Sequence, residues 1–321
     1  MDKIYNKRIL KKLLLIRIIE EEISTRYKKQ LMRCPIHLSI GQESCAVGVC
    51  ENLKLEDIIF SNHRSHAHYI AKGCSIEKMI DEIHGKESGC IGGRGGSMHL
   101  QDIKKGFFGG FPIVGSSIGL ATGTAFASKR KNLKIVTSVF FGDGAMEEGI
   151  IHESLNFASL FKLPIIYICE NNFFSIFTHI KDRQTSSNFT RFAKAHNIKS
   201  LRINGNKLDN VLISFKKIVK YVRQTSKPFF LQLDTYRYLE HCGPNSDDYH
   251  NYRKKNELNF WLNLDPIKYY ENKLKKKKII NDIEIVKIKK NIKKKVELIF
   301  NKSEKATFPI PNSAKKNVFK K

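Results

Sequence analysis

Two short polar motifs follow two consecutive apolar segments in the middle of the chain. Asp143 follows the segment 133–140, and Asn172 follows the segment 164–170. If both segments are strands of one parallel sheet, their carboxyl ends meet at the edge where open α/β sheets bind ligands. Carboxylate and carboxamide oxygens suit octahedral Mg²⁺ better than zinc. Either motif alone is typical of an ordinary turn or loop, but their joint placement predicts a site for Mg²⁺ and an anionic ligand.

The elements that must position these residues alternate regularly between residues 133 and 236. Continuous apolar segments separated by helical patterns predict strand–helix–strand units of a parallel sheet, because such strands are buried on both faces. We expect strands at 133–140, 164–170, around 198–203 and at 229–236, and helices at about 146–160 and around 208–225. The fold class is therefore α/β, with a parallel sheet covered by helices on both faces.

Two further segments predict helices. The sequence GSSIGLATGTAFASK places Gly115, Gly119 and Gly123 on one helical face, which allows close packing against a neighbour. The N-terminal apolar run is interrupted by Lys11 and Arg17 and is followed by no small-residue cleavage site, so it indicates an amphipathic helix rather than a signal peptide.

Composition limits the classes of protein to consider. The chain has 321 residues, 41% of them hydrophobic, which is enough to bury a core and excludes a disordered chain. The net charge is +26, and almost half of the excess lies in residues 271–321, a Lys-rich, mainly helical tail that we expect to present a solvated face. The excess is lysine rather than arginine, and no nucleic-acid-binding module is present, so we expect no nucleic-acid partner.

The seven cysteines indicate a compartment. They are an odd number at irregular spacing without a C-x-x-C pair, which argues against a disulfide framework and for the reducing cytosol. No run of about 18 apolar residues occurs, so we expect no membrane span. The chain is therefore predicted to be soluble and cytoplasmic.

The motif GDGAMEEG, followed after a gap by CENN, resembles the thiamine-diphosphate motif of the α subunits of 2-oxo-acid dehydrogenase E1 components. This group includes the pyruvate, branched-chain 2-oxo-acid and acetoin dehydrogenases. The resemblance extends from about residue 10 to about residue 265 and includes CPIHLSIGQE, FSNHRSHAHYIAKG, GGRGGSMHL, FPIVGSSIGLATG, HESLNFASLFKLP and TYRYLEHCGP. It implies a thiamine-diphosphate-binding fold in a domain that spans residues 1–270.

The resemblance also implies roles for individual residues. For Mg²⁺ it implies the side chains of Asp143 and Asn172 and the backbone carbonyl of Phe174. The residues implied to contact thiamine diphosphate are His63, Arg64, Pro112, Val114, Gly144, Ala145 and His241. His37 and His66 match histidines on the approach to the thiazolium ring, and His66 and His241 are the candidate proton-transfer residues, since imidazoles titrate near neutrality.

The implied reaction is oxidative decarboxylation of a 2-oxo acid such as pyruvate, with acyl transfer to the lipoyl group of an E2 acyltransferase. In the family a glutamate that protonates the aminopyrimidine ring comes from a second chain. The resemblance therefore implies an α₂β₂ heterotetramer, and we expect the chain to be inactive without its β subunit.

The sequence departs from the family pattern at three positions. Pro112 replaces a glycine and has no amide to donate, and His63 replaces a tyrosine. Cys242 stands where mitochondrial enzymes have a phosphorylated serine, so that control is not expected. GGRGGSM is not a phosphate-binding loop, because it lacks both G-x-G-x-x-G and the P-loop pattern, and we expect a flexible loop near the active site.

Other functions stay open from the sequence. The chain could act on acetoin or another specialised carbonyl substrate, or it could be a catalytically silent scaffold subunit. HRSHAH could in principle bind zinc, but it lacks a nearby cysteine or carboxylate ligand, so we do not expect zinc there. The other histidines, among them His68, His99 and His152, are expected to be structural.

Overall fold

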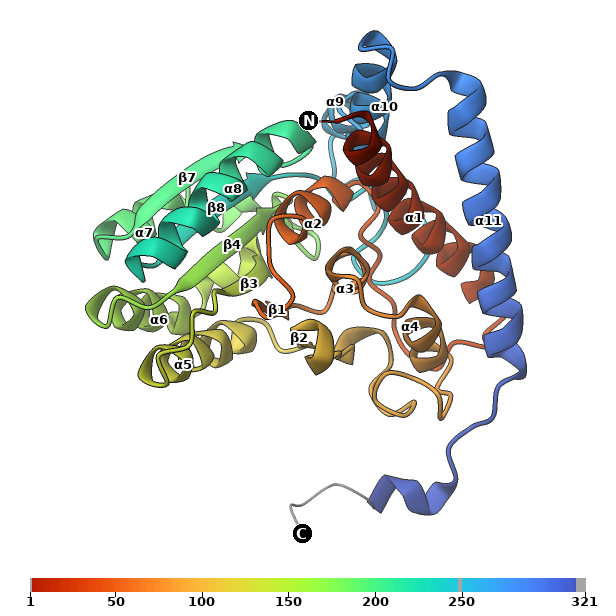
Figure 1. Ribbon diagram of the computed structural model, residues 1–321, viewed down its shortest axis with the longest axis horizontal. Helices are drawn as coiled ribbons and strands as arrows, with labels where there is room; N and C mark the ends of the chain where they lie inside the picture. The colour runs from red at the N-terminus through yellow and green to blue at the C-terminus, as the bar shows by residue number, and fades with distance from the viewer. Residues whose placement is uncertain (1, 248–249, 316–321) are drawn as a thin grey trace.

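A six-stranded parallel sheet forms the centre of the molecule (Figure 1). The computed structural model describes residues 2–247 and 250–315. The strand order is β2-β1-β3-β4-β8-β7. The strands are β1 (Ile58–Ser61), β2 (Phe107–Gly110), β3 (Thr137–Gly142), β4 (Ile165–Asn171), β7 (Lys199–Asn204) and β8 (Phe229–Asp234). The predicted α/β class with a parallel sheet is confirmed.

Helices bury both faces of the sheet, and successive side chains of each strand point to opposite faces. In β4, Ile166 and Ile168 lie in one hydrophobic core, whereas Ile165, Tyr167 and Cys169 lie in the other. The first core also takes in the apolar sides of α1 (Lys3–Tyr27), α2 (Glu43–Cys50), α3 (His66–Lys72), α4 (Ile76–Ile83) and α8 (Leu208–Thr225). The second takes in those of α5 (Ser116–Arg130), α6 (Gly149–Leu160) and α7 (Thr190–Ala195).

The predicted middle elements are all present, with shifted ends. The strand predicted at 133–140 begins at Thr137 and continues to Gly142, because every residue of β3 pairs in register with β4, from Thr137 opposite Ile165 to Gly142 opposite Glu170. The helix predicted from about residue 146 is preceded by a 3₁₀ turn, Asp143–Glu147, and α6 begins at Gly149 after an extended Glu148.

The predicted close packing of α5 holds for two of its three glycines. A Cβ atom at Gly115 or Gly119 would lie 3.1 or 3.4 Å from the side chain of Ile150, so these positions fit α5 closely against α6. Gly115 also has a φ of +85° directly before the helix, a conformation that favours glycine. A Cβ at Gly123 would meet no atom within 4 Å, so close packing does not require glycine there.

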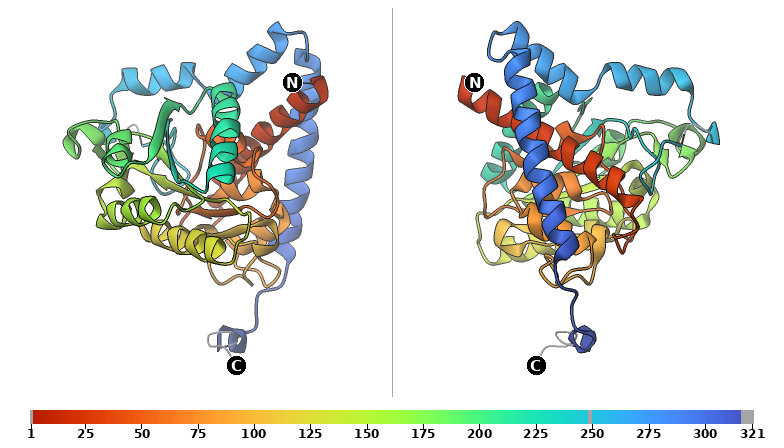
Figure 2. Two further views of the ribbon diagram at one scale, coloured as in Figure 1. Left: turned by 60° about the vertical axis from the view of Figure 1, so that its left-hand side comes forward. Right: turned by 90° about the vertical axis from the view of Figure 1, so that its right-hand side faces the viewer.

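The Lys-rich tail forms α10 (Pro266–Lys276) and α11 (Asp282–Lys305), after α9 (Lys255–Asn263). Figure 2 shows α11 running alongside α1, and α11 also contacts α4. Val296, Ile299 and Phe300 are buried against the core, while the lysines of α11 lie on its other side. The proposed boundary after residue 270 falls inside α10, and residues 316–321 of the proposed tail lie outside the described residues. The division of the chain into two parts stays a prediction.

The helices of the described part of the chain include none with both the length and the apolar character needed to cross a bilayer.

Candidate active site

A cavity of about 220 Å³ opens at the carboxyl edge of the sheet. Its walls come from the segments that follow β1, β3, β4 and β8, from those before α2 and α5, and from the glycine-rich loop. All the predicted site residues except His66 line it, namely His37, His63, Arg64, Pro112, Val114, Asp143, Gly144, Ala145, Asn172, Phe174 and His241. The register of β3 and β4, which pairs Gly142 with Glu170, brings Asp143 and Asn172 to the same edge as the sequence predicts.

Asp143 is a buried carboxylate whose hydrogen bonding is incomplete. It is 1% exposed; Arg183 donates to its Oδ2 atom, and its Oδ1 atom has no hydrogen-bond partner within residues 2–247 and 250–315. Burial raises the pKa of Asp143, and the Arg183 guanidinium opposes that rise. Such a carboxylate lacks a second cationic or hydrogen-bonding partner on the side of Oδ1.

Asn172 and Phe174 belong to a tight turn beside Asp143. The Asn172 Oδ1 atom accepts a hydrogen bond from the Phe174 backbone amide at 3.1 Å. Phe174 begins the short hairpin of β5 (Phe174–Ser175) and β6 (Thr178–His179). Gly144 faces this hairpin so closely that a Cβ atom would lie 2.8 Å from the Ser175 Oγ atom. A side chain at position 144 would therefore displace the Ser175 side chain of this hairpin.

Arg64 places a guanidinium against the cavity, and among the described residues no carboxylate bonds directly to it. It is 5% exposed and donates to the backbone carbonyls of Leu38 at 2.7 Å and His241 at 3.0 Å. Burial, with Arg237 nearby, lowers the pKa of Arg64 to about 9. A buried guanidinium that is bonded only to backbone carbonyls favours an anionic ligand.

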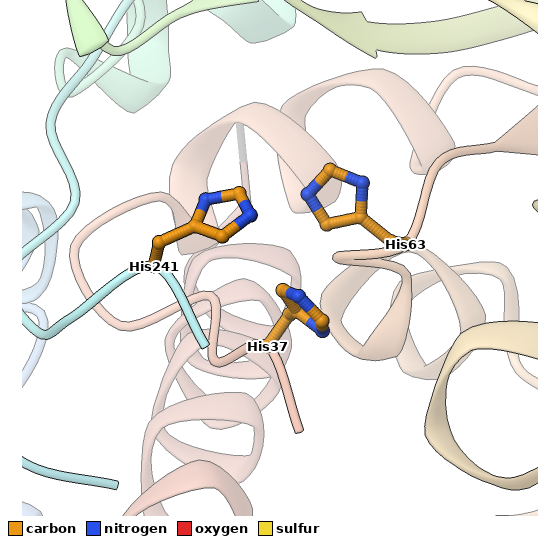
Figure 3. Close-up of side chains that lie close together, drawn as sticks. All are labelled: His37, His63 and His241. Atoms are coloured by element: carbon orange, nitrogen blue, oxygen red, sulfur yellow. The ribbon is translucent and has the colours of Figure 1, made fainter. Parts of the chain in front are cut away.

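Three predicted histidines, His37, His63 and His241, converge at the cavity (Figure 3). The ring centroids of His37 and His63 lie 4.7 Å apart, and that of His241 lies 5.2 Å from each. Burial, followed by the charge of Arg64, lowers the pKa of His37 to about 2 and that of His63 and His241 to about 3. At this pKa the His241 imidazole of the ligand-free chain is neutral and only weakly basic, unlike a histidine that titrates near neutrality, and its role in proton transfer stays a prediction.

His66 does not reach the cavity. Its side chain is fully buried, with Nδ1 3.2 Å from Glu20 Oε2 and Nε2 2.7 Å from Ser97 Oγ. Both ring nitrogens are therefore occupied in joining α3 to α1 and to the glycine-rich loop. His68 is likewise held between Ser61 and Glu170. These contacts give both histidines a structural role, and the proton-transfer role of His66 stays a prediction.

The glycine-rich loop, GGRGGSM, was predicted to be flexible, but hydrogen bonds to one carboxylate hold it in place. The Glu82 carboxylate accepts hydrogen bonds from the backbone amides of Ile91, Gly93, Gly95 and Gly96, at 2.8–3.2 Å. Amides that could contact a phosphate in a phosphate-binding loop are thus occupied by a carboxylate of the protein itself.

Two arginines near the cavity were not predicted from the sequence. Arg237 is 3% exposed, donates to the Tyr252 hydroxyl at 2.8 Å and leaves its Nη1 atom without a partner. Its charge also contributes to the lowered pKa of His63 and His241. Its place in TYRYLEHCGP, just after the strand β8, was the available signal. The sequence carried no signal for Arg183, because this residue contacts Asp143 only through the folding of the loop after β4.

The fold and this cavity define an α/β protein with a ligand site at the carboxyl edge of a parallel sheet. The family model described as "Dehydrogenase E1 component" matches residues 11–312. A Rickettsia bellii protein named pyruvate dehydrogenase E1 component subunit alpha is 32% identical over 302 residues, which cover 94% of this chain and 91% of that protein. The α subunit of acetoin:2,6-dichlorophenolindophenol oxidoreductase from Bacillus subtilis is 33% identical, covering 93% and 88%.

The chain belongs to the dehydrogenase E1 component family. Within it, the chain is an α subunit of the thiamine-diphosphate-dependent 2-oxo-acid dehydrogenase type, an oxidoreductase subunit that requires a β subunit.

Proposed function

We propose that this α subunit binds thiamine diphosphate with Mg²⁺ in the described cavity and acts on a 2-oxo acid such as pyruvate. The observation that supports the cation is Asp143, a buried carboxylate beside Asn172 with one oxygen unpartnered. Carboxylate, amide and backbone carbonyl oxygens are the ligands that Mg²⁺ prefers. Asp143, Asn172 and the Phe174 carbonyl would hold the ion.

The cationic wall of the cavity suits a diphosphate. Arg64 presents its buried guanidinium from the segment after β1, and Gly144 and Ala145 form the turn opposite. Guanidinium groups bind phosphate oxygens bidentately, which fixes the orientation of the ligand as well as its charge. Pro112 and Val114 lie in the cavity wall where the aminopyrimidine ring would pack, and His63 stands beside Arg64 on the diphosphate side.

When bound, thiamine diphosphate supplies the electron sink for decarboxylation, and the protein supplies binding, orientation and proton transfer. His241 and His37 lie at the same cavity as neutral imidazoles, which can accept a proton or a hydrogen bond from a substrate group. A bound diphosphate would offset the positive charge of Arg64, which after burial is the second cause of their lowered pKa, and so would make these imidazoles more basic.

The rim of the cavity supports a proposed interface with the β subunit in an α₂β₂ heterotetramer. Apolar side chains are exposed there, at Ile113, Val114, Ile176 and Phe177. Exposed apolar side chains grouped beside a cavity mark interaction surfaces. A β subunit seated on this rim would complete the active site, and the acyl group would then pass to a lipoyl-bearing E2. The seven free thiols agree with a proposed cytoplasmic location.

The magnesium assignment is tested by titration calorimetry of the chain purified with its β subunit. Thiamine diphosphate is added with and without Mg²⁺ to the wild type, to Asp143→Ala, and to Asp282→Ala as a control on the exposed start of α11. We expect Mg²⁺-dependent binding that is lost, or weakened at least about 100-fold, only in Asp143→Ala. A Kd for thiamine diphosphate that changes neither with Mg²⁺ nor with the Asp143→Ala substitution would contradict the proposal.

A second candidate substrate is acetoin, because the Bacillus subtilis relative is as similar as the pyruvate dehydrogenase subunits. Steady-state assays of the complex with pyruvate, branched-chain 2-oxo acids and acetoin, at matched concentrations, distinguish the two. The preferred substrate is the one with the highest kcat/KM. Binding of cofactor without turnover of any of them would instead indicate a scaffold subunit.

A further inference from the structure

The segment that follows α11 contacts the turn that leads into the glycine-rich loop. The helix α11 ends at Lys305, and we call residues 306–313 the C-terminal strap. Figure 1 shows this segment leaving α11 beside the loops that follow α4. The strap begins with the sequence ATFPIP, whose two prolines restrict the backbone to extended conformations. The strap therefore loses less conformational entropy than a flexible segment when it is held against the protein.

Lys86, in the turn after α4, anchors the start of the strap. It is 4% exposed, and its Nζ atom donates to the backbone carbonyls of Glu304 at 3.3 Å and Ala306 at 2.9 Å. The last carbonyls of a helix have no partner within the helix, so a buried ammonium group is a suitable donor for them. Beside it, the Glu87 backbone amide donates to the Thr307 carbonyl at 3.0 Å.

Phe308 is the side chain by which the strap contacts this turn. The centroid of its ring lies 3.7 Å from the Lys86 Nζ atom and 5.7 Å from the guanidinium carbon of Arg33. Each cation is close enough to the ring for a cation–π attraction. Phe308 also lines a small hollow together with Gly85 and Gly93, so the ring reaches the glycine-rich loop itself.

The far end of the strap is bonded directly to the glycine-rich loop. Arg94, at the centre of GGRGGSM, donates from its Nη2 atom to the Ser313 carbonyl at 2.6 Å. Glu82 therefore holds this loop from the side of α4, and the strap holds it from the side of α11. The loop ends at Met98, which lines the cavity. One wall of the cavity thus depends on a segment more than 200 residues later in the chain.

We propose that the C-terminal strap is a positioning element of the active site. It holds the glycine-rich loop, and through this loop Met98, in the arrangement that binds the ligands of the cavity. This inference rests on the proposed function, because it assumes that thiamine diphosphate and a 2-oxo acid bind there. The strap carries no group that touches the cavity, so its loss should weaken binding and leave the chemical step nearly unchanged.

Hydrogen exchange in the absence of ligand tests whether the strap holds the loop. The full chain with its β subunit is compared with a chain that ends at Lys305, with Phe308→Ala and Phe308→Tyr, and with the control Ile310→Ala, at a strap residue that is 59% exposed. Exchange at residues 91–96 should be at least about 5-fold faster in the shortened chain and in Phe308→Ala, which lose the cation–π contacts. Phe308→Tyr keeps the ring and should exchange as the wild type and Ile310→Ala do.

Calorimetry and steady-state kinetics of the same proteins test the role in binding. The Kd for thiamine diphosphate and the KM for the 2-oxo acid should rise at least about 3-fold in the shortened chain and in Phe308→Ala, while kcat changes less than about 2-fold. Phe308→Tyr should restore the wild-type values. Because Phe308 is 52% exposed, these substitutions should leave the melting temperature of the chain nearly unchanged.

Two results would overturn this role of the strap. One is equal exchange at residues 91–96 in all five proteins. The other is faster exchange with unchanged Kd and KM, since the strap would then be a structural contact alone. A wild type that binds no thiamine diphosphate would instead refute the proposed function, and the exchange result, measured without ligand, would still decide whether the strap holds the loop.

Discussion

Asp143 is shared between two possible partners, a cation and Arg183. In the ligand-free chain Arg183 bonds to both Asp143 and Glu147 and so holds the polar loop after β4 against the turn after β3. A Mg²⁺ ion at the Oδ1 atom of Asp143 would share the carboxylate with this guanidinium, whose positive charge repels the ion. The ion pair therefore stabilises the ligand-free site and opposes metal binding.

Removing Arg183 should strengthen metal-dependent cofactor binding. In Arg183→Gln the ligand-free state loses a charge-assisted hydrogen bond worth about 1.5–3 kcal/mol, so the melting temperature without ligand should fall. The apparent Kd for thiamine diphosphate with Mg²⁺ should decrease roughly 10-fold for the same reason. Calorimetry with Arg191→Gln, in the first turn of α7, is the control. An increase in Kd would show that Arg183 itself helps to bind the cofactor.

The histidine cluster predicts how stability depends on pH. The pKa values of His37, His63 and His241 are lowered to about 2–3 in the folded chain, against about 6.5 when unfolded. Below pH 6.5 the unfolded chain therefore binds protons that the folded chain does not, and stability falls as pH decreases from about 6.5 toward 3.

His63→Phe should make this loss of stability shallower. Each depressed imidazole contributes at most about 1.4 kcal/mol per pH unit below pH 6.5, and the variant lacks one of the three. Urea unfolding at about pH 5.0 and 6.0, with about pH 7.5 as the reference above the window, measures the slope. His99→Gln, at an exposed histidine, should keep the slope of the wild type, and an unchanged slope in His63→Phe would refute the assignment.

At the scale of elements, α4 organises one wall of the cavity through a single side chain. Glu82 lies on α4, is fully buried and accepts four backbone amides of the glycine-rich loop. Met98, at the end of this loop, lines the cavity. The order of this wall therefore depends on the charge of Glu82.

Glu82→Gln should loosen the glycine-rich loop. The amide group presents N–H donors to backbone donors, so two or more hydrogen bonds are lost at a cost of about 2–4 kcal/mol in the free energy of unfolding. Hydrogen exchange at residues 91–96 should become faster than in the wild type. Glu77→Gln, in the first turn of the same helix, serves as the control, and equal protection in both variants would count against the role of Glu82.

The strands and the placement of Asp143 and Asn172 were predictable because they depend on local patterns, whereas the other predicted cavity residues came only from the resemblance to the family. Continuous apolar segments ending at Asp143 and Asn172 determine both the strands and their shared edge. The occupied nitrogens of His66, the anchoring of the glycine-rich loop by Glu82 and the pairing of Arg183 were not predictable, because each depends on a contact between segments far apart in sequence. The magnesium and cofactor roles stay predictions.

At the scale of the whole molecule, α11 belongs to the same core as α1. Phe300 of α11 is fully buried and lies under the guanidinium of Arg26 at 5.1 Å from the ring centroid. Arg26 also bonds to Glu304 at 2.7 Å. Farther along, the Lys86 Nζ atom donates to the Ala306 carbonyl at 2.9 Å. The lysines of α11 are solvated, but its opposite face is structural.

Phe300→Ala should destabilise the whole chain rather than the tail alone. Removing a buried phenylalanine costs about 3–5 kcal/mol in the free energy of unfolding. Leu298→Ala, at a residue 61% exposed on the same helix, should change it by less than about 0.5 kcal/mol. Chemical unfolding followed by circular dichroism measures both. A loss confined to α11, with the rest unfolding as before, would show that the tail is an independent unit.

The contact between α1 and α11 also has a consequence during synthesis of the chain on the ribosome. About 280 residues separate the starts of these helices, which at roughly 5–20 residues per second is about 15–60 s of translation. During most of that interval the part of α1 that faces α11 lacks the helix that covers it, while α2 and α3 can already pack on the rest. The nascent chain therefore needs a temporary cover for this surface, and molecular chaperones that bind exposed apolar segments are suited to supply it.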